Sequence, residues 1–386
     1  MFRGLPRTVI ALGLVSLCMD TSSELIHSLL PLYLVAGLGV SAGLLGLVEG
    51  IAEATASLMR VFAGVLSDRV GKRKPLILAG YGLAALSKPL FPLASGVGTV
   101  LLARVADRIG KGIRGAPRDA LLADVTPEAL RGAAYGLRQS LDTVGAVIGP
   151  LAAVFLMTVL DGDIRAVLWA GVVPAALAVL LIVLLVQEPE HTRPTPRRSA
   201  GLHRHDIAAL PPAFWRVAWL GALLSLARFS EAFLLLRASD MGLPAAQVPL
   251  VLVVLNVAYA LSAWPLGHIS DRLGRRGLLV AGLAVLVLAD VLLALDVGGW
   301  AFGAGILLWG LHMGATQGVI AAMVADVAPA SMRGTAFGVL HCSSAVALLL
   351  ASVMAGGLWS LVGAPATFVA GAVFALMACV VAMRMP

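Results

Sequence analysis

The 386-residue chain has little charge, four tyrosines and only three cysteines. Charged side chains make up 13% of it and hydrophobic ones 60%, whereas a soluble domain averages about 25% charged and about 45–50% apolar residues. This scarcity of charge, with a mean hydropathy of +0.96, excludes a soluble enzyme and predicts a polytopic membrane protein. Cys18, Cys342 and Cys379 lie in apolar stretches without metal-ligand spacing, so we expect neither a disulfide framework nor a zinc site.

Long apolar runs are what the sequence has in abundance. A membrane-spanning helix needs about 20 mostly apolar residues. Twelve segments qualify, so we predict an all-α membrane protein with twelve transmembrane helices. The first span is too long, and too charged at its centre, to be a cleaved signal peptide. The expected spans cover residues 8–36, 42–66, 75–93, 97–123, 132–158, 165–187, 213–237, 246–269, 277–296, 300–325, 334–357 and 363–383.

A polar segment separates the sixth span from the seventh. Residues 188–212 are rich in Pro, Arg and His and lack apolar periodicity, so we interpret them as a cytoplasmic linker between six-helix bundles at 1–187 and 213–386. Lys and Arg concentrate in alternate loops, in this linker and at both ends. Because cytoplasmic loops are enriched in Lys and Arg, we expect both termini on the cytoplasmic side of an inner membrane. The net charge of +7 therefore indicates membrane topology and not nucleic-acid binding.

Two motifs occur twice in the same order. "GVLSDRVGKRKPL" at 64–76 recurs as "GHISDRLGRRGLL" at 267–279, and "ADVTPEALRGAAYG" at 123–136 recurs as "ADVAPASMRGTAFG" at 325–338. The offsets of 203 and 202 residues are nearly equal, which indicates that one half of the chain is a duplicate of the other. Parallel repeats of this kind place a substrate path between the halves, near the membrane midplane.

These residues resemble the major facilitator superfamily of secondary transporters over essentially the whole chain. The 64–76 motif and its second copy match the loop signature of that family. "GAVIGP" at 145–150 resembles a glycine-proline motif common in its exporters, and Arg108-x-x-Lys111-Gly112 resembles its arginine motif linked to proton transfer. The resemblance implies a transporter fold of two pseudo-symmetric bundles that works by alternating access.

The loop motif is expected to act as a conformational latch. A carboxylate near a helix N-terminus gains roughly 0.3–1 kcal/mol, and Asp68 would face the helix start near Arg333 while Asp271 would face the one near Arg131. The alternative is that these are only topogenic charges in tight turns. The candidate latch residues are Gly64, Asp68, Arg69, Gly71, Arg73, Asp271, Arg272, Arg131 and Arg333.

Ionisable residues inside the spans are the strongest functional signal. Such a residue costs about 2.5–3.5 kcal/mol at the centre of a span, so it usually faces a cavity and has a partner. Most of them lie in the first half, which we therefore expect to perform the ionic work. The proton or substrate site is predicted to include Asp20, Glu24, His27, Glu49, Glu53, Arg104, Arg108, Arg138 and Asp142.

Within that set, Asp20 and Glu24 are one helical turn apart. Paired carboxylates in a low dielectric exchange protons near neutral pH, so we predict that they carry the coupling proton, with His27 as relay or partner. The alternative is permanent ion pairing with the basic stripe of the expected helix 97–123. Arg114 and Arg118 on that stripe are expected to extend toward the cytoplasmic surface.

The second half has fewer ionisable residues in its spans that could line a central cavity. Its candidate cavity residues are Arg228, Glu231, Asn256, Tyr259, His312, Gln317 and His341, although a single histidine facing a helix bundle often serves only as a hydrogen-bonding group.

We consider three functions, in order of how well the sequence supports them. The first is proton-coupled efflux of a small charged or amphipathic solute by a monomer in the bilayer, without cofactor or nucleic acid. The second is export of a transition-metal cation, since imidazole and carboxylate groups suit such ions, but the basic stripe would repel cations. The third, a non-transporting sensor or membrane enzyme, lacks an extramembrane domain, a convincing nucleophile–base pair and a phosphate loop. We expect a transporter and not an enzyme.

Overall fold

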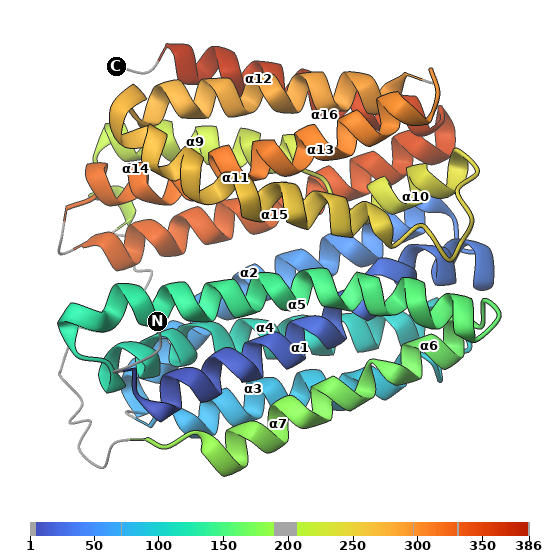
Figure 1. Cartoon of the computed structure of the whole chain (residues 1–386). Helices are drawn as coiled ribbons and strands as arrows, with labels where there is room; N and C mark the ends of the chain where they lie inside the picture. The colour runs from blue at the N-terminus through green and yellow to red at the C-terminus, as the bar shows by residue number, and fades with distance from the viewer. Residues whose placement is uncertain (1–4, 71, 189–206, 296, 330–331, 385–386) are drawn as a thin grey trace. The chain divides into compact units, whose positions relative to one another are not determined.

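The computed structural model describes residues 5–70, 72–188, 207–295, 297–329 and 332–384. Within these ranges the chain is helical almost throughout and contains no β-strand, which confirms the predicted all-α fold (Figure 1). Eight of the described helices are long and apolar enough to cross a membrane. Most of the predicted linker lies outside the described residues, because 189–206 fall in a gap.

The chain divides into two compact units. Unit 1 comprises residues 1–33, 55–199 and 245–249, and unit 2 comprises 34–54, 200–244 and 250–386. The elements that start in the first half are α1 (Arg7–Leu32), η1 (Tyr33–Gly37), α2 (Ala42–Val70), α3 (Lys74–Ser87), η2 (Lys88–Leu90), α4 (Val97–Val125), η3 (Glu128–Leu130), α5 (Arg131–Val159), α6 (Ile164–Ala170) and α7 (Val172–Leu185). Helix α2 begins in unit 2 and continues into unit 1.

The second half repeats the same succession of helices. Its elements are α9 (Pro212–Ala227), α10 (Ala232–Asp240), α11 (Leu250–Leu273), α12 (Arg275–Ala294), α13 (Gly299–Thr316), α14 (Val319–Val327), α15 (Arg333–Leu361) and α16 (Ala364–Met383). The helices of both halves cover the predicted spans to within a few residues. What the apolar runs did not predict is that three spans are interrupted, between α6 and α7, between α9 and α10, and between α13 and α14.

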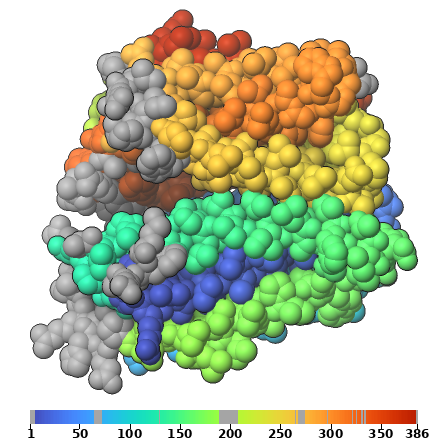
Figure 2. All heavy atoms as spheres, in the orientation of Figure 1, coloured from blue at the N-terminus to red at the C-terminus, as the bar shows by residue number. Residues whose placement is uncertain are grey.

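Unit 1 is built around α1, which packs against α5 and α7 (Figure 2). Its buried side chains include Leu12, Val15 and Met19 of α1, with Tyr81 of α3 and Ile182 of α7 in the same cluster. Small residues allow two helix backbones to approach each other most closely. Close van der Waals packing matters in lipid, because the hydrophobic effect does not drive membrane helices together. This core fixes the positions of the polar side chains that α1, α4 and α5 carry.

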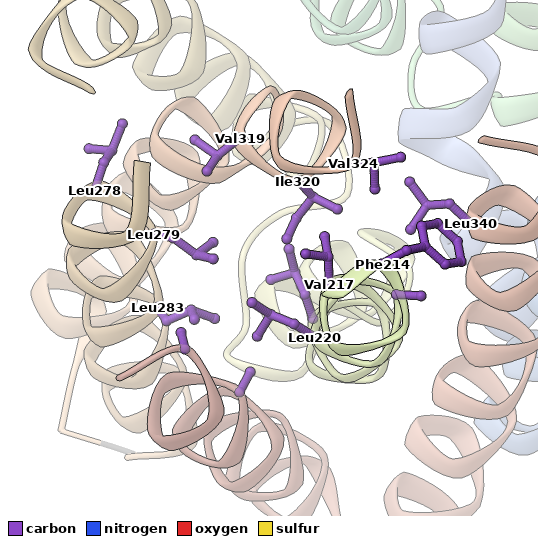
Figure 3. Packing of buried hydrophobic residues seen from close by; sticks show 14 of the residues in the cluster. Phe214, Val217, Leu220, Leu278, Leu279, Leu283, Val319, Ile320, Val324 and Leu340 are labelled. Carbon is purple, nitrogen blue, oxygen red and sulfur yellow. The ribbon is translucent and has the colours of Figure 1, made fainter. Parts of the chain in front are cut away.

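Unit 2 has its own apolar core. Side chains of α9, α12, α14 and α15 interdigitate there, among them Phe214, Leu279, Ile320 and Leu340 (Figure 3). The first turns of α2 pack on α15 through glycines, since a Cβ on Gly46 would lie only 2.2 Å from the carbonyl oxygen of Ser352. The backbones of these two helices are therefore in direct contact.

Candidate functional site

Two glycines of α5 bring α1 and α5 into backbone contact. A Cβ on Gly145 would lie 2.7 Å from the carbonyl oxygen of Leu17, and one on Gly149 would lie 2.6 Å from that of Thr21. Both glycines belong to the "GAVIGP" segment, so its local role is close helix packing. The same approach places the side chains that precede it on α5 beside those of α1.

The result is that the carboxyl groups of Asp20 on α1 and Asp142 on α5 lie close enough to interact electrostatically, and we call them the carboxyl pair. Two neighbouring carboxyl groups favour holding one proton between them, because two ionised carboxylates repel each other. Arg114 Nη2 lies 3.9 Å from Asp20 Oδ1, and Arg138 Nη1 lies 3.5 Å from Asp142 Oδ2. The pair is partly accessible, with side-chain exposures of 19% for Asp20 and 24% for Asp142. It therefore has the elements of a site that can hold and exchange a proton.

The sequence groups Asp20 with Glu24 and names His27 as their relay or partner. Glu24 does lie beside His27, with 3.5 Å between Oε2 and Nδ1. Spacing along α1 groups Asp20 with Glu24 because they share one helix face. It cannot reveal Asp142, which interacts with Asp20 from another helix, α5. His27 is buried and Glu24 is partly exposed.

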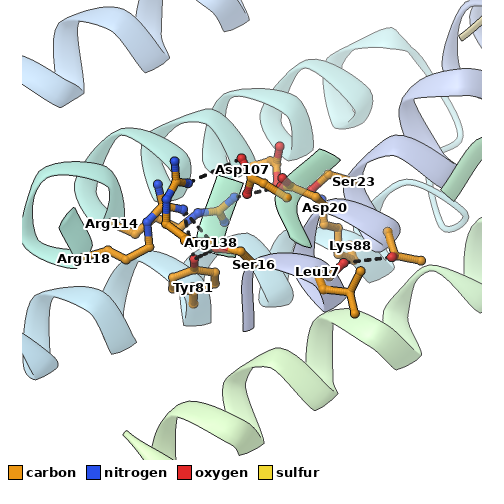
Figure 4. Close-up of polar contacts among 12 residues, drawn as sticks. Ser16, Leu17, Asp20, Ser23, Tyr81, Lys88, Asp107, Arg114, Arg118 and Arg138 are labelled. Carbon is orange, nitrogen blue, oxygen red and sulfur yellow. Dashed lines mark hydrogen bonds and ion pairs between the residues drawn. The ribbon is translucent and has the colours of Figure 1, made fainter. Parts of the chain in front are cut away.

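Three arginines surround the carboxyl pair (Figure 4). Arg114 stacks on the ring of Tyr81, with 4.4 Å from its Cζ to the ring centroid. Arg118 donates to Ser16 Oγ at 3.3 Å and to the Tyr81 hydroxyl at 3.4 Å, and Arg138 donates to the Gln139 side chain at 2.6 Å. The Arg114 and Arg118 side chains are only 5% and 13% exposed. The expectation that these two extend to the surface is therefore wrong, because a hydroxyl and an aromatic ring from neighbouring helices hold them inside.

A second polar contact in unit 1 was missed from the sequence. Lys88 Nζ lies 2.8 Å from Asp107 Oδ1 and donates to Ser23 Oγ at 2.9 Å. The Lys88 and Asp107 side chains are 1% and 4% exposed, so this is a fully desolvated ion pair. A lysine in an apolar span indicates that a buried acidic partner is needed. The separation of Lys88 and Asp107 along the sequence does not predict that these two residues are in contact. Arg104 and Arg108 are buried on the same helix as Asp107.

The candidate site residues Glu49 and Glu53 both lie in the part of α2 that belongs to unit 2. Glu49, in the part that belongs to unit 2, is fully buried and accepts a hydrogen bond from Ser230 Oγ at 3.2 Å. Ser230 is in the interruption between α9 and α10, which also contains Arg228 and Glu231. Glu53 is half-buried. The structure thus joins Glu49 to the broken seventh span.

Unit 2 contains a buried polar contact at the position equivalent to that of Lys88 and Asp107. With the repeat offset of 202 residues, Lys88 corresponds to Asp290 and Asp107 to Trp309. Trp309 Nε1 donates to Asp290 Oδ1 at 3.1 Å, and Asp290 is fully buried. The duplicated scaffold therefore keeps one polar contact between equivalent helices while exchanging an ion pair for an indole–carboxyl contact.

Of the other second-half candidates, Tyr259 and Gln317 line the same cavity of unit 2. His312 is fully buried, and its Nδ1 lies 2.8 Å from the carbonyl oxygen of Gly282, which is the arrangement of a core histidine with its hydrogen bond satisfied. Asn256, Tyr259 and His341 are half-buried on α11 and α15, and Gln317 is exposed at the interruption between α13 and α14.

Both copies of the loop motif make an equivalent ion pair inside their own unit. Arg73 Nε lies 3.3 Å from Asp124 Oδ2 at the end of α4, and Arg275 pairs with Asp326 at the end of α14. The structure does not describe the side chains of the remaining latch candidates, Asp68 and Asp271 among them. These side chains belong to residues 64–70, 267–273 and 333, and Gly71 lies outside the described residues altogether. Arg131 is exposed and pairs with Glu128.

No group of three or more metal-ligating side chains occurs in the part of the chain that the structure describes. The imidazole and carboxylate groups that would serve a transition-metal exporter therefore do not gather into one ligand set among the described residues.

Comparisons with known proteins agree with this architecture. The profile of the Major Facilitator Superfamily matches residues 12–236 and 230–385. An uncharacterised MFS-type transporter of Methanocaldococcus jannaschii is 30% identical over 382 residues, which are 97% of this chain and 94% of that protein. The class C tetracycline resistance protein of Escherichia coli is 32% identical over 289 residues, 70% of each chain. Among solved structures, a mutant of the nucleoside transporter NupG has a TM-score of 0.80 at 13% identity, covering 97% of this chain and 99% of that one. The chain belongs to the Major Facilitator Superfamily.

Proposed function

We propose that the protein is a proton-coupled secondary transporter that exports a small charged or amphipathic solute. The observation that carries the coupling is the carboxyl pair of Asp20 and Asp142, in which Arg114 of α4 lies 3.9 Å from Asp20 and Arg138 of α5 lies 3.5 Å from Asp142. Family membership supports secondary transport. The similarity to a tetracycline resistance protein supports the outward direction.

The chemistry of the pair explains how a proton would drive a conformational change. With one proton, the two carboxyl groups share a hydrogen bond and hold α1 and α5 together. Without it, the two carboxylates repel each other, and the low dielectric of a buried site strengthens that repulsion. Arg114 and Arg138, at 3.9 and 3.5 Å, are positioned to take up the separated charges. Loss of the proton therefore favours a different arrangement of α1, α4 and α5.

The proposal includes the topology inferred from the charges of the loops. Both termini are cytoplasmic, the membrane is the inner membrane, and the bundles at 1–187 and 213–386 move against each other as a monomer. Positive residues near 69–74 and 272–276 then face the cytoplasm in both halves, as the enrichment of Lys and Arg in cytoplasmic loops requires.

The test uses purified protein in liposomes with an imposed pH gradient. Tetracycline, ethidium and benzoate serve as the first panel of radiolabelled probes, and any probe that the wild type accumulates is carried forward. We expect Asp142→Asn and Asp20→Asn to lose accumulation driven by the gradient while retaining exchange of labelled for unlabelled probe. Asp119→Asn is the matched control, because this carboxylate contacts Arg118 and Arg138 but is not in the pair. Gradient-driven accumulation that survives both variants would refute the proton site.

A further inference from the structure

A cavity of about 350 Å³ lies within unit 2, among α11, α12, α13 and α14. It adjoins the turn at residues 317 and 318 that separates α13 from α14 in the tenth span, where the backbone angles stay close to helical values. The equivalent span of the first half, α4, is helical without interruption from Val97 to Val125. The walls of the cavity in unit 2 are formed by Tyr259, Ala263, Arg275, Leu278, Gly314, Ala315, Gln317, Gly318, Val319 and Ala322.

The walls combine apolar surface with a few polar groups. Leu278, Val319 and three alanines supply the apolar part, whereas Arg275 is the charged member. Arg275 Nη1 donates to the carbonyl oxygen of Ala322 at 2.8 Å and pairs with Asp326. Small-molecule sites are typically concave, mostly apolar cavities of about 300–1,000 Å³ with a few placed polar groups. The cavity meets this description.

The ion pair on Arg275 is of the kind that a ligand can replace. The Arg275 and Asp326 side chains are 43% and 57% exposed, so water screens their attraction and holding them together gains little. A guanidinium offers five N–H donors in a planar fork that matches a carboxylate or phosphate. An oxyanion entering the cavity would therefore compete with Asp326 for the same donors, while its apolar body lies against Leu278 and Val319.

We propose that this cavity binds a small amphipathic organic anion, with its anionic group on Arg275 in place of Asp326. The site is distinct from the carboxyl pair of unit 1, and binding to it requires no proton gradient. Success or failure here is thus separate from the outcome of the coupling experiment on Asp20 and Asp142.

The test measures binding of radiolabelled benzoate and of its neutral counterpart benzamide to the purified full-length protein by equilibrium dialysis, with protein-free micelles as the blank. Benzoate is expected to bind at least tenfold more tightly than benzamide. Arg275→Ala should weaken benzoate binding about tenfold or more, as the loss of a charge-assisted hydrogen bond predicts, and leave benzamide binding unchanged. Asp326→Asn should strengthen benzoate binding about two- to fivefold, the range for removing an exposed ion pair.

Two controls separate binding from folding. Arg276→Ala removes the neighbouring arginine, which contacts the carbonyl oxygen of Met383 and does not line the cavity, so benzoate binding should not change. Ala263→Leu fills the cavity and should weaken both probes alike. If Arg275→Ala does not fold, Arg275→Lys and Asp326→Asn carry the test. Equal affinities for benzoate and benzamide, or an Asp326→Asn variant that leaves benzoate binding unchanged, would overturn the proposal.

Discussion

Replacing Lys88 by methionine should destabilise unit 1 strongly. The Lys88 ammonium is 2.8 Å from the Asp107 carboxylate, and both side chains are almost completely buried. Removing one member of a buried pair typically costs about 3–5 kcal/mol, because the other charge stays desolvated without its partner. Arg104 and Arg108 also act on the charge of Asp107, so we expect a loss near the lower end, about 3 kcal/mol. The measurement is the free energy of unfolding from SDS titration in mixed micelles.

The double variant Lys88→Met/Asp107→Leu tests the reasoning. Replacing both members of a buried pair by apolar residues is often neutral, so most of the lost stability should return. Arg131→Met is the matched control for an exposed pair, because the Arg131 and Glu128 side chains are 45% and 88% exposed, and it should cost at most about 1 kcal/mol. A Lys88→Met protein as stable as the wild type, or a double variant as unstable as the single one, would contradict the assignment.

Two further substitutions test packing in unit 2. Gly356→Leu should separate α2 from α15 and lower the free energy of unfolding by about 1–3 kcal/mol or more, because a Cβ there would lie 2.5 Å from the carbonyl oxygen of Ala42, whereas Gly357→Leu has open space and should cost less. Crosslinking of engineered cysteines on the two helices reports the separation, and equal effects of both leucines would argue against it. Asp290→Asn should retain an acceptor for the Trp309 indole and stay close to wild-type stability, whereas Asp290→Leu leaves that donor unsatisfied and should cost about 1–3 kcal/mol in the same SDS titration. A leucine variant as stable as the asparagine variant would show that the hydrogen bond contributes nothing.

The membrane class, the helical fold and the repeat could be predicted because each depends on local sequence. An apolar run long enough to cross the bilayer must be helical, since its backbone polar groups have no water to bind. The duplicated motifs fixed the relation between the halves, and from that relation Lys88 and Asp290 are seen to occupy equivalent positions. Interruptions such as the one at Gln317 escaped prediction, because an apolar segment stays equally apolar whether its helix is continuous or broken.

The sequence by itself determined which groups must be kept out of lipid: charged side chains in the first-half spans that need partners, because a lone charge in hydrocarbon is too costly. It did not determine the partners. Spacing along one helix suggested Asp20 with Glu24, whereas the glycines of α5 bring Asp142 against α1 and make the carboxyl pair. Likewise, Arg114 is held inside the protein by Tyr81 of another helix. Contacts between helices depend on how closely two backbones approach and at which rotation, and only the tertiary structure sets those quantities.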